Sequence, residues 1–275
     1  MLETPLISII VPCYNQAQYL PETLQSVLDQ ELLQWECLIV NDGSPDNTGD
    51  IAKQWCAKDT RFKYLEKANG GLADARNYGI RHAQGKYILP LDSDDKISPT
   101  YTKEAIAILD NNASVKLVCC RAMLFDGDNE EWKLLPYSYE NLLFVRNCMH
   151  CSSVYRNSDY NNTQGYNTNM KGGWEDYDFW IGLLEREDKV IFLDKIHFYY
   201  RTKEVSMRTQ ISKDMEDCLR KQIFKNHIDK YLAEIDPIEQ YRELKECRMV
   251  ESSLQYRIGA FISAPVRIIR SIFNK

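Results

Sequence analysis

Several features of other protein classes are missing from this chain of 275 residues. No apolar run approaches the roughly 20 residues that a membrane-spanning helix needs, so we do not expect an integral membrane protein. Basic residues are not in excess: the formal net charge is −6, which argues against general nucleic-acid binding. The N-terminal Met1-Leu-Glu-Thr-Pro5 has no secretory leader pattern, and the expected location is the cytoplasm.

A disulfide framework is also lacking. The nine cysteines are odd in number and scattered, a pattern typical of free thiols in a reducing compartment. Only Cys148 and Cys151 have the spacing of a metal-ligating pair, and no second Cys/His pair accompanies them at zinc-site spacing. Buried structural thiols are therefore the favoured interpretation, with a zinc site as the alternative.

About the first hundred residues alternate between strand-like and helix-like segments. Near-continuous apolar runs, typical of parallel strands buried on both faces, lie at residues 6–11 and 37–40, and two further strands are predicted at 62–66 and 86–91. Helical periodicity lies between them, at residues 21–30, 48–58 and 72–83. This rhythm predicts an α/β fold with a parallel, doubly wound sheet, in which ligands bind beyond the carboxyl ends of the strands.

The middle of the chain is less regular. Its patterns predict short strands at 117–120, 190–193 and 196–200 and a helix at 174–187. The segment 157–173 is predicted to be a mobile loop. From Ser212 onward the pattern is helical and charged, so we place a domain boundary near residue 210.

Polar clusters follow three of the predicted strands, at Cys13-Tyr14-Asn15, Asn41-Asp42-Gly43-Ser44 and Asp92-Ser93-Asp94-Asp95. Parallel strands would bring these clusters to one rim. Asp92 and Asp94 are two residues apart after an extended run, so their carboxylates point to the same side. A cation relieves their repulsion, and Mg²⁺ or Mn²⁺ takes oxygen ligands and bridges to substrate phosphates. The alternative is a solvated acidic turn.

Two weaker signals belong to the same rim. Asp42 can accept a hydrogen bond from a ring N–H of a base, or it can simply cap a turn. The Asn69-Gly70-Gly71 turn lets backbone amides and a helix N-terminus approach an anionic group closely, although a Gly-Gly pair alone usually marks only a turn. Arg76 lies about one turn further along that helix.

These segments resemble glycosyltransferase family 2, which has the GT-A fold. The resembling stretches are Ile9-Ile-Val-Pro-Cys-Tyr-Asn15, Val40-Asn-Asp-Gly-Ser-Pro-Asp-Asn-Thr48, Asn69-Gly-Gly-Leu-Ala-Asp-Ala-Arg-Asn-Tyr-Gly79 and Leu91-Asp-Ser-Asp-Asp95. The resemblance implies an inverting, metal-dependent enzyme that moves a sugar from a nucleotide-diphosphate-sugar, expected to be a UDP-sugar, to an acceptor hydroxyl. Asn41 departs from the family pattern, which usually has Asp there.

The resemblance also implies residue roles. The donor site would contain Pro12, Tyr14, Asn15, Asp42 and Asn69 around the nucleoside, together with Gly71 and Ser93. Arg76 and Asp92 would lie near the ribose and diphosphate. Asp94, helped by Asp92, would be the principal ligand of Mg²⁺ or Mn²⁺.

The second half adds a match to the family's Glu-Asp motif, in Gly173-Trp-Glu-Asp-Tyr-Asp-Phe-Trp180. An inverting transfer needs a base within hydrogen-bond reach of the acceptor hydroxyl. By this resemblance Asp176 is that base and Glu175 orients the acceptor, although carboxylates in a first helical turn also complement the helix dipole. Arg201 resembles a later motif and would neutralise the departing diphosphate, whereas Lys203 stands where a His is common.

The expected organisation is a GT-A domain at 1–210 and a helical extension at 211–275. Within the first domain, residues 1–100 would bind the donor and 101–210 the acceptor. The tail at 255–275 has four basic residues, many apolar ones and no acid. Such a segment can lie on the inner face of an anionic membrane; docking on the body or forming a homodimer are the alternatives.

The expected acceptor is a surface polysaccharide or a lipid-linked oligosaccharide. A rival function is a non-catalytic nucleotide-sugar-binding partner in a membrane-associated assembly. A nucleotidyltransferase is a second rival, but the Gly-rich basic triphosphate loop that it needs near the first strand is missing.

Overall fold

The computed structural model describes residues 4–245 apart from 205, 207, 237, 240 and 244. In chain order its elements are β1 (Ile7–Cys13), α1 (Leu20–Leu28), β2 (Trp35–Asn41), α2 (Thr48–Lys58), β3 (Phe62–Glu66), α3 (Leu72–Arg81), β4 (Tyr87–Pro90), β5 (Lys96–Ile97), α4 (Tyr101–Asn111), β6 (Val115–Phe125), β7 (Glu131–Trp132), the π-helix η1 (Asn141–Val145), β8 (Val154–Arg156), α5 (Asn157–Asn161), α6 (Glu175–Leu183), β9 (Lys189–Arg201), the 3-10 helix η2 (Arg208–Gln210), α7 (Lys213–Asn226) and α8 (Ile228–Glu234).

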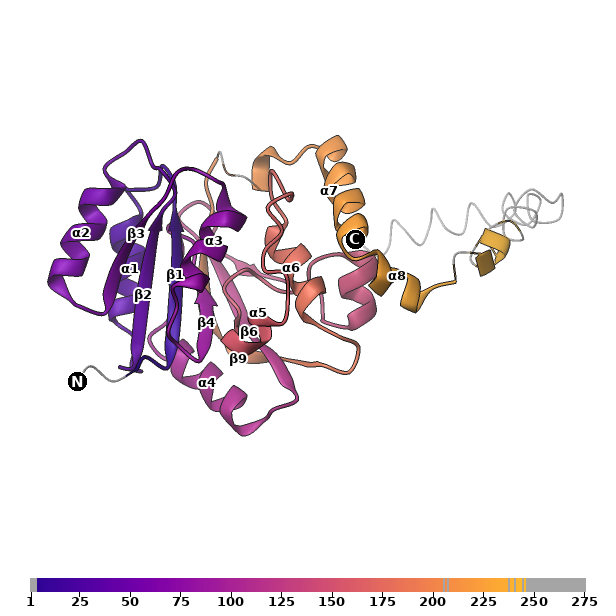
Figure 1. Cartoon of the computed structure of the whole chain (residues 1–275), viewed down its shortest axis with the longest axis horizontal. Helices are drawn as coiled ribbons and strands as arrows, with labels where there is room; N and C mark the ends of the chain where they lie inside the picture. Colours follow the sequence, from indigo (N-terminus) through magenta and orange to yellow (C-terminus); the bar gives the residue numbers. More distant parts are fainter. Residues whose placement is uncertain are drawn as a thin grey trace, which may run out of the picture. The chain divides into compact units, whose positions relative to one another are not determined.

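Strands β1 to β4 form a parallel region in the order β3-β2-β1-β4. Every residue of β1 and β2 is buried, which explains their near-continuous apolar sequences, because such strands are covered on both faces. Helix α3 lies over one face of these strands and α1 lies behind the other (Figure 1). Gly79 lets α3 approach closely, since a Cβ there would lie 2.5 Å from Ile10 Cγ2. The α/β arrangement expected from the sequence is confirmed in this half.

The second half of the sheet mixes strand directions, so the doubly wound parallel pattern is confined to the first half. The order continues β4-β8-β6-β9-β5, with β8 antiparallel to both neighbours, β9 parallel to β6 and β5 antiparallel to β9. The sequence suggested two strands at 190–193 and 196–200, but β9 is one strand. Its pairing with β6 continues through register shifts around Arg121 instead of ending.

The segment 157–173 is packed into the body, which corrects the expectation of a mobile loop. It begins with α5, and Tyr166 and Met170 are buried. The Asn77 side chain of α3 holds it, because Nδ2 donates to Tyr166 O at 2.7 Å and Oδ1 accepts from Tyr166 N at 2.8 Å. The Tyr166 ring also stacks on Phe179 of α6 with centroids 4.2 Å apart. These contacts position α6, whose first residues belong to the candidate site.

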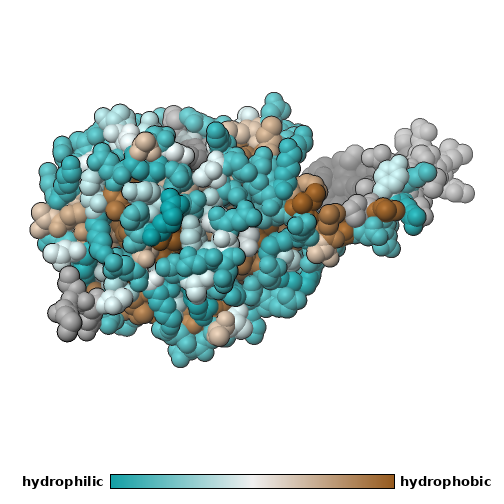
Figure 2. Space-filling view, in the orientation of Figure 1, coloured by the Kyte–Doolittle hydropathy of each residue, from teal (hydrophilic) through white to brown (hydrophobic). Residues whose placement is uncertain are grey.

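By its contacts the chain divides into two compact units, Met1–Asn226 and His227–Lys275. Helix α7 belongs to the first unit and buries Leu219 and Ile223, while α8 lies in the second. The domain boundary near residue 210 stays a prediction, and the tail at 255–275 lies outside the described residues. Among the residues that are described, no helix is long and apolar enough to cross a membrane. Hydrophilic residues cover most of the face of the first unit that Figure 2 shows.

Candidate active site

The loops after β1 and β2 are joined at the carboxyl edge of the parallel strands. Asn15 N donates to Ser44 Oγ at 2.9 Å, and Asn15 has φ of 55°, a left-handed conformation that Asn adopts more readily than most residues. Pro12 is buried inside β1 and does not end it. Tyr14, the residue after β1, is 50% exposed. The predicted convergence of strand ends is therefore found here.

Asp42 and the glycine turn also come together. The Asp42 carboxylate accepts hydrogen bonds from Gly70 N at 3.0 Å, Gly71 N at 2.8 Å and Lys67 Nζ at 2.6 Å, and the Asn69 side chain donates to the Asp42 carbonyl at 3.0 Å. A carboxylate offers about four acceptor positions, so one remains on Oδ2 for a base N–H. The turn amides, by contrast, already bind Asp42 and do not face an open anion site. Lys67 had no signal in the sequence.

Arg76 joins the donor half of the predicted site to the acceptor half. Its guanidinium is fully buried; Nη1 lies 2.5 Å from Glu175 Oε1, and Nη2 lies 2.6 Å from Asp92 Oδ1. Burial of a cation is costly unless it is paired, and two carboxylates pair this one. The sequence placed Arg76 near the ribose and diphosphate, which stays a prediction; the geometry adds that Arg76 bridges Asp92 and the start of α6.

Asp94 is paired with a lysine. Lys203 Nζ lies 2.5 Å from Asp94 Oδ2 and 3.2 Å from Gln16 Oε1. Burial and the charge of Asp92 raise the pKa of Asp94, and Lys203 opposes that shift. The side chains of Asp92 and Asp94 are 25% and 19% exposed, while Ser93 between them is buried. Both side chains are accessible carboxylates of the kind that Mg²⁺ or Mn²⁺ takes as ligands, but Asp94 can bind an ion only if Lys203 releases it.

Arg201 stabilises the turn that carries these aspartates. Its Nε donates to Asp94 O at 2.8 Å, and its backbone N donates to Asp95 Oδ1 at 2.8 Å. Nη1 pairs with Asp126 at 2.6 Å, and Nη2 pairs with Glu22. The guanidinium is thus held by two carboxylates, and contact with a diphosphate would require one of them to let go. Its role toward the diphosphate stays a prediction.

Asp176 is the half-buried carboxylate at the start of α6. Burial, followed by the charge of Glu175, raises the pKa of Asp176 to about 7, and Arg76 opposes the shift. Asn147 Nδ2 donates to Asp176 Oδ2 at 3.1 Å and so orients it. Glu175 is buried in its pair with Arg76, which leaves Asp176 as the carboxylate suited to take a proton near neutral pH. Asn147 was missed because its stretch of sequence has no clear periodicity.

The profile of Glycosyl transferase family 2 matches residues 8–177, more than half of the chain. This chain belongs to glycosyltransferase family 2.

Curated relatives are much longer than the matched region. The chain is 47% identical over 94 residues to the uncharacterized glycosyltransferase EpsJ of Bacillus subtilis, covering 34% of this chain and 27% of EpsJ. It is 28% identical over 207 residues to the minor teichoic acid biosynthesis protein GgaB of Bacillus subtilis, covering 72% of this chain and 23% of GgaB. The match with this chain therefore spans about a quarter of the length of each of these two relatives.

Solved structures show the fold. S. aureus TarS 1-349 in complex with UDP-GlcNAc superposes with a TM-score of 0.62 at 19% identity, covering 82% of this chain and 72% of that one. Mannosyltransferase PcManGT from Pyrobaculum calidifontis, in complex with GDP-Man and Mn²⁺, gives 0.58 at 16% identity, covering 98% and 88%. At these identities the likeness concerns the fold alone, and it confirms the GT-A fold expected from the sequence.

Proposed function

We propose that this chain is an inverting glycosyltransferase that moves a sugar from a nucleoside diphosphate sugar to an acceptor hydroxyl. The observation that carries the proposal is the buried Arg76 bridge. One guanidinium pairs with both Asp92 and Glu175. Asp92 is predicted to lie near the diphosphate, and Glu175 precedes Asp176, the predicted base. A binding module would have no need to couple its nucleotide pocket to a half-buried carboxylate whose pKa is raised to about 7.

The donor is proposed to be a UDP-sugar. The remaining acceptor position on Asp42 Oδ2 suits the ring N–H of uracil, and the exposed Tyr14 ring can cover the base. The TarS structure holds UDP-GlcNAc, while PcManGT holds GDP-Man, so both donors belong in a test. A preference for the uridine compounds in that test would support the role of Asp42 in binding the base.

Asp94 and Asp92 would hold Mg²⁺ or Mn²⁺, which when bound neutralises charge that develops on the leaving diphosphate. Lys203 must then leave Asp94 Oδ2, and its ammonium would supply a further positive charge for the leaving diphosphate. Asn147 and Asp176 act on the other reactant. Asn147 holds Asp176 Oδ2, and Asp176 takes the proton of the acceptor hydroxyl as the oxygen bonds to the anomeric carbon. The bond to the diphosphate breaks on the opposite face, so the configuration inverts.

Transfer assays with a panel of UDP-sugars and GDP-Man, each with Mn²⁺ or Mg²⁺, test this function. Asp94→Ala and Asp176→Ala should lose turnover, whereas the matched control Asp214→Ala, at the start of α7, should keep it. The rival, a non-catalytic nucleotide-sugar-binding partner, predicts tight donor binding with no turnover in any variant. Full transfer by Asp176→Ala would remove the base assignment.

The acceptor is proposed to be a surface polysaccharide or a lipid-linked saccharide at the inner face of the membrane. GgaB is named for minor teichoic acid biosynthesis, which suggests an acceptor of the cell wall. The tail at residues 255–275 is proposed to contact the membrane. A homodimer formed through the same residues is the alternative. Flotation with anionic liposomes should separate the full chain from a version ending at residue 254. Equal flotation of the two would remove the membrane proposal.

A further inference from the structure

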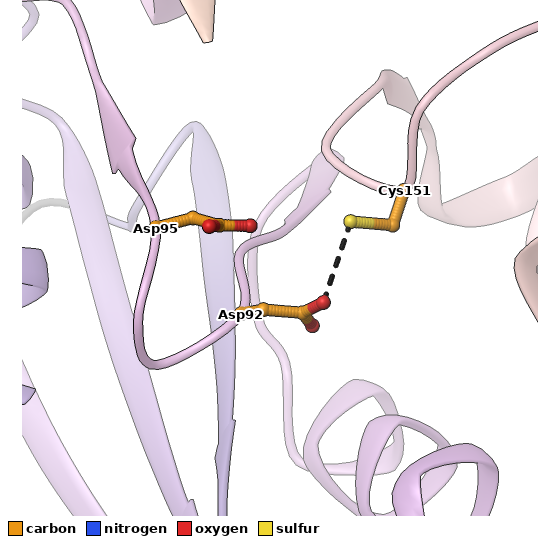
Figure 3. Close-up of side chains that lie close together, drawn as sticks. All are labelled: Asp92, Asp95 and Cys151. Carbon is orange, nitrogen blue, oxygen red and sulfur yellow. Dashed lines mark hydrogen bonds between the residues drawn. The ribbon is translucent and has the colours of Figure 1, made fainter. Parts of the chain in front are cut away.

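Three potential metal ligands from two separate loops converge beside the strand-end carboxylates. Asp92 and Asp95 follow β4, and Cys151 precedes β8, 59 residues beyond Asp92. One ligand atom from each side chain lies within 4.8 Å of the others. Figure 3 shows the Asp95 carboxylate and the Cys151 thiol pointing toward one another above Asp92, with Cys151 Sγ 3.5 Å from Asp92 Oδ2.

Each carboxylate is oriented through one of its two oxygens. Asp92 Oδ1 accepts from Arg76 Nη2 at 2.6 Å, and Asp95 Oδ1 accepts from Arg201 N at 2.8 Å. Hydrogen bonds of this kind hold carboxylate ligands in place in metal sites. Asp95 is only 1% exposed, and its Oδ2 is buried with no hydrogen-bond partner among the described residues. An unpartnered buried oxygen is costly, so it marks a position where a ligand would stabilise the fold.

We propose that Asp92, Asp95 and Cys151 bind a borderline-soft divalent cation of the Zn²⁺ type. An ion about 2.3 Å from sulfur and about 2.1 Å from oxygen, in tetrahedral geometry, holds the two atoms about 3.6 Å apart. Cys151 Sγ and Asp92 Oδ2 lie 3.5 Å apart. A thiolate favours such an ion over Mg²⁺. On binding, the sulfur–metal bond replaces the S–H bond, the proton passes to solvent, and water completes the fourth position.

The proposed site differs from the pairing that the spacing of the cysteines suggested. Cys148 Sγ donates to Arg146 O at 3.4 Å, and the buried His150 ring stacks on Phe198 with centroids 4.4 Å apart, so neither turns toward Cys151. Since Asp92 is also a predicted ligand of Mg²⁺ or Mn²⁺, a bound Zn²⁺ would compete for it. Zinc is therefore expected to inhibit any reaction that needs the other metal.

Titration of the metal-free full-length chain with Cd²⁺ tests the site, because a thiolate–Cd²⁺ bond absorbs in the ultraviolet. We expect one equivalent of Cd²⁺ to produce this band and Zn²⁺ to abolish it. Cys151→Ser should lose the band and bind about tenfold more weakly or worse. The matched control is Cys218→Ser, which removes an exposed thiol of α7 and should keep both band and affinity.

The absence of a band in the parent chain, or an equal band in Cys151→Ser, would overturn the proposal. Asp95→Asn should also weaken Cd²⁺ binding. If the affinity of this variant for Cd²⁺ is undiminished, Asp95 is not a ligand and the three-residue site is wrong. Circular dichroism checks that this buried variant folds, and Asp92→Asn replaces it if it does not. None of these readouts requires sugar transfer, so they stand or fall separately from the proposed enzyme activity.

Discussion

Replacing Asp176 by Asn should strongly reduce sugar transfer and at the same time stabilise the metal-free fold at alkaline pH. Burial raises the pKa of Asp176 from 3.8 to about 7. Each unit corresponds to about 1.4 kcal/mol, so ionising this group in the folded chain costs up to about 4 kcal/mol more than in the unfolded chain. Asn has the same shape without the charge and escapes that cost.

The sign follows from proton binding. Between pH 3.8 and about 7 the folded chain keeps a proton on Asp176 that the unfolded chain has lost. Stability of the parent therefore falls as pH rises through this window and stays reduced above it. The advantage of Asp176→Asn should be small near pH 4, grow up to about pH 7 and then level off, as the parent pKa requires.

Urea unfolding of both proteins across this pH range, with EDTA present, measures the difference. Transfer should fall by about 100-fold or more, as for loss of a general base. The matched control is Asp214→Asn on α7, which should change neither stability nor turnover appreciably. A stability gain that does not vary with pH, or a loss at pH 8, would refute the assignment of a strained, proton-holding carboxylate.

The remaining predictions concern the contacts around this group. Asn147→Ala removes a donor to the ionised carboxylate, so the pKa of Asp176 should rise, and the acidic limb of the pH–rate profile should move to higher pH. Arg76→Ala leaves two carboxylates unpaired, and urea unfolding should show a loss of about 3–5 kcal/mol. Lys203→Met frees Asp94 from its ammonium, so Mn²⁺ binding followed by electron paramagnetic resonance should tighten by about tenfold.

Each of these changes has a control and a contrary outcome. An unshifted profile in Asn147→Ala would mean that this residue does not orient the base. A loss below about 1 kcal/mol in Arg76→Ala, the value typical of an exposed pair, would contradict the buried bridge. Lys195→Met removes a lysine from the exposed pair with Glu104 and should leave Mn²⁺ binding unchanged. Unchanged or weaker Mn²⁺ binding in Lys203→Met would show that the ammonium does not compete with the ion.

The parallel half of the fold was predictable because its signals are local. Apolar runs marked β1 and β2, and the helix at 48–58 and the strand at 62–66 were predicted to the residue. The mixed half was not predictable in the same way. β8 has three residues, and Asp194-Lys195 interrupts the apolar pattern of β9 although the strand continues. Packing of 157–173 depends on the distant Asn77, which leaves no mark in the segment itself.

The residues of the candidate site were predictable, but their pairings were not. Strand-end positions place Asp42, Asp92 and Asp94 at one edge from topology alone. Long-range contacts decide their partners: Arg76 reaches Glu175 across 99 residues, and Lys203 reaches Asp94 across 109. No local pattern encodes such a contact. The structure adds that Arg76 bridges two carboxylates and that Arg201 holds the aspartate turn, while their predicted place near the diphosphate stays a prediction.

Inverting transfer with Asp176 as the base is the central claim, and proton NMR of donor turnover tests it most directly. When water serves as the acceptor, the first free sugar formed should have the anomeric configuration opposite to that of the UDP-sugar. Asp176→Asn should still bind UDP but form product at least about 100-fold more slowly. A first product with the donor's own configuration, or undiminished turnover by Asp176→Asn, would contradict the account.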